Sequence, residues 1–85
     1  MEMREGVRVD SVEGCHLRLN DSVFPATLLN ISTTGLLVSC SDVHLQPGNT
    51  CGVCLTISLD RAPCEFMCEV VRVDDTGIAV KFIGS

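Results

Sequence analysis

Apolar and polar residues alternate along most of the chain. In residues 15–20, cysteine and leucine alternate with histidine, arginine and asparagine, and the same period of two recurs in residues 51–59 and 78–82. Successive side chains of a β-strand face opposite sides, so each run predicts a strand with one buried face. β-Branched residues are frequent in these runs, which suits a pleated, half-buried surface.

Turn-forming residues separate the alternating runs. Clusters of Asn, Asp, Pro and Gly occur at residues 20–22, 46–49, 60–63 and 74–77, and these residue types favour turns. The pattern therefore predicts six strands, at residues 12–20, 24–31, 35–41, 50–60, 64–73 and 77–83. Six short strands at this spacing predict an all-β, six-stranded antiparallel β-barrel, and closure of the barrel removes exposed sheet edges.

The 85 residues predict one small domain with a leading arm. Residues 12–85 form the predicted barrel. Residues 1–11 carry two arginines and only scattered apolar side chains, so we expect an N-terminal arm that leads into the barrel. Little sequence follows the last predicted strand, and no long C-terminal helix is expected.

Composition narrows the class of protein. No run approaches the ~20 consecutive apolar residues of a membrane span, and residues 1–5 are charged where a signal peptide needs an apolar run. We therefore expect a cytoplasmic protein without membrane insertion. The net charge of −5 disfavours binding of DNA or RNA polymers. Lys81 is the single lysine, so a bound anion would be held by a few placed arginines.

Two short motifs carry the candidate chemistry. The arm contains R-x-x-x-R, with Arg4 and Arg8 at its ends, and residues 30–35 read N-x-S-x-x-G between the second and third predicted strands. From typical residue frequencies, the two motifs arise by chance in about 20% and about 5% of chains this long. Their occurrence together, in this order and in an alternating all-β chain, is a coincidence of under ~1%.

The two motifs resemble the signature of the PilZ family, and residues 70–73 and 77–82 are similar to its last two strands. The resemblance covers nearly the whole chain and implies a PilZ-like barrel of the split-barrel type. It also implies binding of cyclic di-GMP, a bacterial second messenger. The expected protein is an effector or adaptor, a monomer or weak dimer, that passes the signal to a downstream protein partner. Motility, biofilm formation or polysaccharide export are typical outputs of the family.

The resemblance also implies which residues hold the ligand. Arg4 and Arg8 each present a planar fork that can grip a phosphate or the O6 and N7 atoms of guanine. Asn30 offers an amide to a guanine edge, and Ser32 offers a hydroxyl. Gly35 would let the backbone bend sharply and approach the ligand closely. The arm would then close over the nucleotide. Because Asn30 lacks the charge of the aspartate that the pattern also admits, we expect a lower affinity.

Six cysteines require a separate interpretation. Residues 51–54 form a C-x-x-C and residues 64–68 a C-x-x-x-C, a set that resembles the ligands of a structural zinc. Against this, Cys51 and Cys54 are an odd number apart in a predicted strand and would face opposite sides. Buried free thiols are the simpler interpretation, and a disulfide is disfavoured in a reducing compartment.

The sequence gives less support for other functions. There is no nucleophile paired with a base, so we do not expect an enzyme, and no cofactor is expected. His16 and His44 have no evident ligand or catalytic neighbour and are expected on the surface. Two alternatives to a nucleotide-binding effector remain. One is a degenerate PilZ-like protein-interaction module that binds no nucleotide, and the other is a small cysteine-rich zinc-binding domain.

Overall fold

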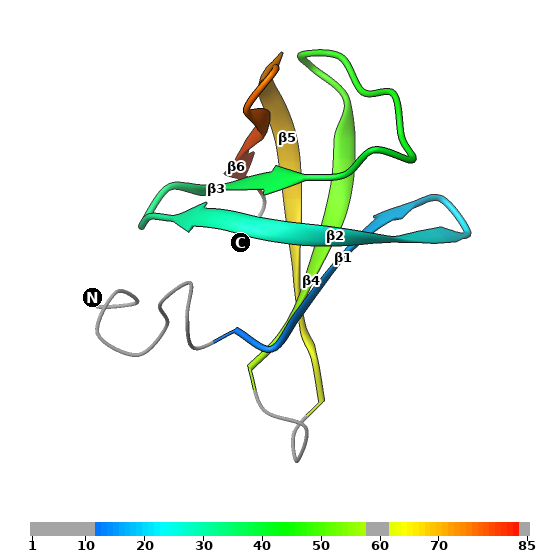
Figure 1. Cartoon of the computed structure of the whole chain (residues 1–85), viewed down its shortest axis with the longest axis vertical. Coiled ribbons are helices and arrows are strands. Elements are labelled where there is room, and N and C mark those ends of the chain that lie inside the picture. The colour runs from blue at the N-terminus through cyan, green and yellow to red at the C-terminus, as the bar shows by residue number, and fades with distance from the viewer. Residues whose placement is uncertain (1–11, 58–61, 84–85) are drawn as a thin grey trace.

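The strands form a closed barrel. A computed structural model of the chain describes residues 12–57 and 62–83. Six antiparallel strands follow one another around the barrel in the order β1-β2-β3-β6-β5-β4 (Figure 1). Their bounds are β1 Gly14–Leu19, β2 Ser22–Ile31, β3 Gly35–Ser39, β4 Thr50–Thr56, β5 Cys64–Asp74 and β6 Gly77–Phe82. The predicted six-stranded antiparallel barrel is confirmed.

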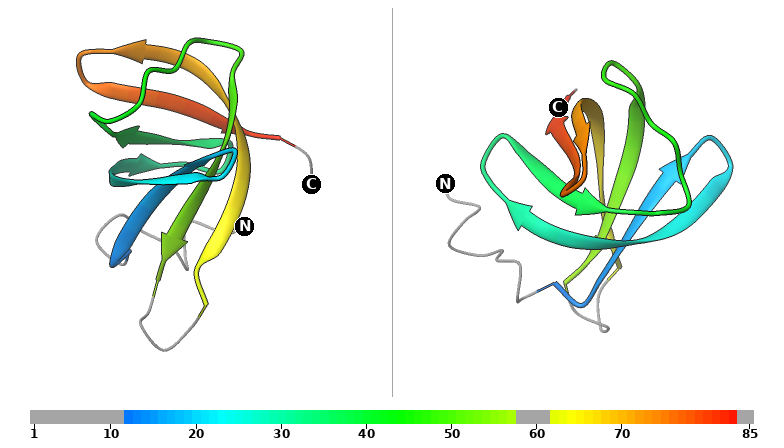
Figure 2. Two further views of the ribbon diagram at one scale, coloured as in Figure 1. Left: turned by 90° about the vertical axis from the view of Figure 1, so that its right-hand side faces the viewer. Right: turned by 45° about the horizontal axis from the view of Figure 1, so that its top comes forward.

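Pairing between β1 and β4 closes the barrel, and the chain reaches β4 through a long connection. Residues 40–49 run from the end of β3 to the start of β4 outside the sheet (Figure 2). Val43 and Leu45 in this connection pack against the core. No helix long and apolar enough to cross a membrane occurs among the described residues.

The strand boundaries differ slightly from those predicted. β2 begins at Ser22, two residues earlier than expected, because Leu19 pairs with Ser22 and leaves a two-residue turn. Asn20 adopts a φ of 55° there, which asparagine tolerates better than most residues. β3 ends at Ser39, short of the predicted residue 41. The end of the strand predicted at 50–60 falls partly outside the described residues.

The interior is filled by the alternating apolar positions that the sequence indicated. Each strand contributes one to three buried side chains, and none of the buried residues among those described is polar or charged. Full burial of a Val or Leu side chain stabilises the fold by about 1.5–3 kcal/mol. The core consists of Cys15, Leu17, Leu28, Leu36, Val38, Cys51, Val53, Leu55, Cys68, Val70, Ile78 and Val80.

The cysteines are free thiols, and three of them belong to the core. Burial raises the pKa of Cys15 to about 11 and that of Cys68 to about 12, so both thiols stay protonated at neutral pH. Cys51 is buried whereas Cys54 is partly exposed, as expected for the two faces of β4. Within residues 12–57 and 62–83, no three potential metal-ligating side chains lie close enough together to hold an ion. His16 and His44 are exposed, as predicted.

Candidate ligand-binding site

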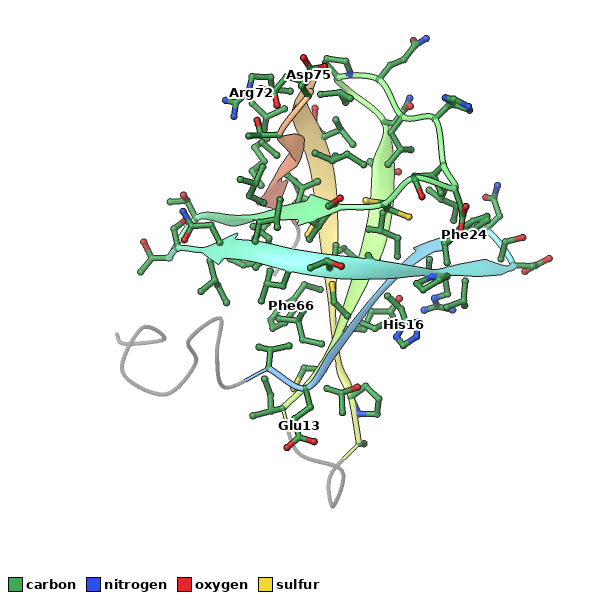
Figure 3. The ribbon with its side chains drawn as sticks, viewed as in Figure 1. Glu13, His16, Phe24, Phe66, Arg72 and Asp75 are labelled. Atoms are coloured by element: carbon green, nitrogen blue, oxygen red, sulfur yellow. The ribbon has the colours of Figure 1, made fainter. Side chains whose placement is uncertain are left out.

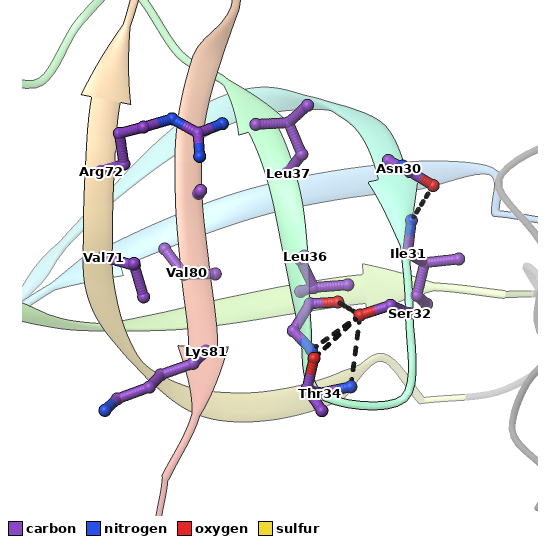
Figure 4. Close-up of a pocket in the computed structure, with 12 residues that line it drawn as sticks. Asn30, Ile31, Ser32, Thr34, Leu36, Leu37, Val71, Arg72, Val80 and Lys81 are labelled. Carbon is purple, nitrogen blue, oxygen red and sulfur yellow. Dashed lines mark hydrogen bonds between the residues drawn. The ribbon is translucent and has the colours of Figure 1, made fainter.

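Ser32 organises the turn that joins β2 to β3. Its backbone N–H donates to the Gly35 carbonyl oxygen at 3.0 Å. Its Oγ accepts hydrogen bonds from the backbone N–H groups of Thr34 and Gly35, both at 3.2 Å (Figure 4). This is the local side-chain-to-backbone bonding typical of serine in turns. The hydroxyl proton can go to Thr34 Oγ1 at 3.2 Å, to the Gly35 carbonyl oxygen at 3.3 Å, or to a ligand. A direct contact of Ser32 with a ligand stays a prediction.

Asn30 lies on the outer surface at the end of β2. Its Oδ1 accepts a hydrogen bond from the backbone N–H of Ile31 at 2.8 Å. The Asn30 amide nitrogen has no hydrogen-bond partner in the described part of the chain, and the residue is exposed. That nitrogen is therefore available as a donor to a guanine acceptor, and Oδ1 keeps a second lone pair that can accept from a guanine N–H.

Gly35 is required by the contact between β3 and β6. A Cβ at this position would collide with the carbonyl oxygen of Val80 on β6. Beside it, the backbone N–H of Phe82 donates to the Thr34 carbonyl oxygen at 2.9 Å, which holds β6 against the turn. The sequence predicted Gly35 for a sharp bend at the ligand. The structure supplies another reason, a close approach of two backbones, and a close approach to the ligand stays a prediction.

A shallow pocket of about 320 Å³ opens beside this turn on the outside of the barrel. Three of the predicted site residues line it: Asn30, Ser32 and Gly35. The remaining lining residues come from the end of β2, the same turn, β3, β5 and β6: Ile31, Thr34, Leu36, Leu37, Val71, Arg72, Ala79, Val80 and Lys81. Arg4 and Arg8, the other two predicted site residues, lie outside the described residues.

The charge of the pocket is opposite to that of the protein. Arg72 and Lys81 are the two charged residues of its lining, and none of the lining residues is a carboxylate. Three other surface hollows each include at least one acidic residue. Each of the two is paired with a carboxylate outside the lining, Arg72 with Asp74 and Lys81 with Glu69 at 3.8 Å. In a chain with a net charge of −5, a lining whose charged side chains are both cations favours an anionic ligand.

Sequence reasoning missed Arg72 and Lys81, although both left a signal. Val70 is buried, so strict alternation would place Arg72 inside the barrel as well. A charged residue at an inward position indicates an irregularity in the strand. Lys81 simply follows the alternation of β6, between buried Val80 and half-buried Phe82, and faces outward.

Fold and pocket together define a small β-barrel with a candidate ligand pocket on its outer face. The profile of the PilZ domain family matches residues 2–85, so the chain belongs to the PilZ domain family. Domains of this family are generally cyclic di-GMP-binding adaptor modules and not enzymes. Searches among curated proteins and among solved structures found no match.

Proposed function

We propose that this protein binds cyclic di-GMP and acts as an effector or adaptor in bacterial second-messenger signalling. Membership of the family supports the class of ligand. The observation that carries the proposal is the pocket beside residues 30–35, which has cations and no carboxylate in its lining. Cyclic di-GMP has two phosphates and two guanines, so it offers both negative charge and flat surfaces with acceptor edges.

The size of the pocket fits one side of such a ligand. Sites for small molecules and cofactors commonly enclose about 300–1,000 Å³, and the described residues supply about 320 Å³. We therefore infer that the barrel provides the floor of the site. Arg4 and Arg8 of the arm provide its cover, by gripping phosphate or guanine acceptors with their guanidinium forks.

The proposed mechanism is closure of the arm over the nucleotide. A ligand shifts a conformational equilibrium only as far as it binds one state more tightly than the other. Contacts from Arg4 and Arg8 exist only in the closed state and supply that difference. Closure changes the surface presented to a downstream protein partner, in a cytoplasmic setting and without chemical conversion of the nucleotide.

Calorimetric titration tests the proposal. We expect cyclic di-GMP to bind the wild-type protein, and GTP and cyclic AMP to bind far more weakly. Arg8→Ala should weaken binding at least ~10-fold, because loss of a bidentate charged contact costs about 1–3 kcal/mol. Ser32→Ala should cost less, since a neutral hydroxyl offers a ligand a weaker hydrogen bond than a charged, bidentate guanidinium does.

Arg18→Ala is the matched control. Arg18 lies on β1, its guanidinium is paired with Glu65, and it does not line the pocket. Its removal changes the net charge as Arg8→Ala does, and we expect unchanged affinity. Wild-type protein that gives no heat with cyclic di-GMP would contradict the proposal and favour the protein-interaction module. Unchanged binding by the double variant Arg4→Ala with Arg8→Ala would refute the role of the arm.

A further inference from the structure

Two β-bulges border the same pair of residues on the outside of the barrel. Leu37 of β3 pairs with Ala79 of β6. The register between β2 and β3 shifts by one residue across residues 28–30, and the register between β5 and β6 shifts across residues 70–72. A bulge inserts one extra residue into a strand and re-aims the side chains that follow. Both shifts occur immediately beside the Leu37–Ala79 pair, one on each side.

The bulges exchange apolar for polar residues beside this pair. Continued without a shift, the two registers would set Leu29 and Val71 beside it. With the shifts, Asn30 pairs with Leu37, and Arg72 pairs with Ala79. The result is an outward row across β2, β3, β6 and β5, with polar ends and an apolar middle. We call it the cross-strand row: Asn30, Leu37, Ala79 and Arg72.

Asp74 holds one edge of the Arg72 guanidinium, and the other edge is available to a ligand. Its Nε donates to Oδ2 of Asp74 at 2.7 Å. The other oxygen of Asp74, Oδ1, accepts from the backbone N–H groups of Thr76 at 2.9 Å and Gly77 at 3.3 Å in the turn between β5 and β6. The carboxylate that orients Arg72 is thus itself fixed by the hairpin. The terminal nitrogens of Arg72 have no partner among residues 12–57 and 62–83.

The direction of the Arg72 side chain agrees with the pairing. Figure 3 shows Arg72 on the outside of the barrel, near the turn that joins β5 to β6. In the close-up, its guanidinium crosses β6 towards Leu37 (Figure 4). Neighbouring strands lie about 4.8 Å apart, so the row from Asn30 to Arg72 spans roughly 14 Å. This is long enough for a base to lie flat on Leu37 and Ala79 between the polar ends.

We propose that Arg72 is a specificity-determining residue of the site, one that binds a guanine base of the bound nucleotide. The base lies on the apolar middle of the cross-strand row, and the terminal N–H groups of Arg72 donate to its O6 and N7 atoms. A base suits this floor better than a phosphate, because Leu37 and Ala79 offer no donors to an anion. The inference rests on the proposed binding of cyclic di-GMP and adds a residue to that same site.

Titration of four proteins with cyclic di-GMP tests this inference: wild type, Arg72→Ala, Arg72→Lys and the control Arg18→Ala. Arg72→Ala should weaken binding about 10-fold. Arg72→Lys should recover little of this loss, because an ammonium keeps the charge but not the fork. Arg18→Ala removes an equal charge from another face and should bind within about twofold of wild type. Thermal unfolding of each variant confirms that the barrel is intact.

The outcomes separate the two proposals. Wild-type protein that does not bind cyclic di-GMP rejects the proposed function, and this inference with it. If the wild type binds and Arg72→Ala binds with equal affinity, the role of Arg72 is rejected and the proposed function stands. Full recovery by Arg72→Lys would show that charge is sufficient and would overturn recognition of the base edge.

Discussion

Two outer faces of the same barrel show how a one-residue shift in register changes which side chains lie next to one another on the surface. The cross-strand row lies beside two bulges and has polar ends around an apolar middle. On another face, a second row crosses β2, β1, β4 and β5 with no register shift, and its ends are exposed and apolar. We call it the regular row: Val23, Arg18, Gly52 and Met67. The bulges therefore place polar residues at both ends of the row, whereas regular alternation places apolar residues there.

Each face also carries an arginine in an ion pair, and the two pairs differ. Arg18 donates to Glu65 through Nε at 2.9 Å and also through a terminal nitrogen, so its fork is largely occupied within the protein. The hydrogen bond and charge of Glu65 raise the pKa of Arg18. Arg72 uses only Nε. The same residue type is thus structural on one face and available to a ligand on the other.

The glycines of the two faces should give the largest contrast. A Cβ at Gly35 collides with backbone, the Val80 carbonyl oxygen, which cannot move without shifting β6. We expect Gly35→Ala to lower the free energy of unfolding by at least about 2 kcal/mol. At Gly52 the obstacle is the end of the flexible Glu65 side chain, so Gly52→Ala should cost less than about 1 kcal/mol. Urea denaturation measures both, and equal losses would contradict the distinction.

Asn30→Asp should strengthen ligand binding at one polar end of the cross-strand row. A carboxylate accepts hydrogen bonds from the N–H donors of guanine more strongly than a neutral amide oxygen does. We expect cyclic di-GMP affinity to rise about fivefold, equivalent to about 1 kcal/mol. Ser22→Asp, on an exposed residue at the other end of β2, is the charge-matched control and should leave affinity unchanged. Weaker binding by Asn30→Asp would show that repulsion of the ligand phosphates outweighs the added acceptor strength.

Asp74→Asn should have the smallest effect, since Asp74 acts on the ligand only by orienting Arg72. Exposed ion pairs contribute little, so we expect about threefold weaker binding of cyclic di-GMP. Because the amide retains an oxygen for the turn, the hairpin should persist. An Asp74→Asn variant that binds as tightly as wild type would show that Arg72 needs no anchor.

The same carboxylate predicts a dependence of stability on pH. Hydrogen bonds from Thr76 and then from Arg72 hold the pKa of Asp74 below its ordinary value of 3.8. The ionised form is therefore favoured in the folded state, and its contribution is complete above that value. It is lost as the pH falls from about 4 towards the lower pKa of the folded state. Melting temperatures of wild type and Asp74→Asn should thus differ at pH 5, and the difference should become smaller as the pH falls towards 2.

The sequence predicted the features that depend on alternation. The six strands and the inward rows, such as Val53 and Leu55, follow directly from the period of two. The close contact of Gly35 with Val80 did not follow, because it joins residues far apart in the chain. The bulges were indicated only indirectly, by Asn30 and Arg72 at positions that strict alternation assigns to the core. The placement of Arg72 in the pocket therefore needed the register of β5 against β6.

The buried thiols give this barrel a built-in reporter of its own opening. A thiol reacts with an alkylating reagent as the thiolate, and only where the reagent can reach it. Cys51 and Cys68 lie in the core, whereas Cys64 is exposed and serves as an internal reference. The ratio of their labelling rates in the native protein therefore measures the free energy of transient unfolding. A bound nucleotide that stabilises the folded barrel would slow labelling of Cys51 and Cys68 and leave the labelling rate of Cys64 unchanged, so no engineered cysteine is needed.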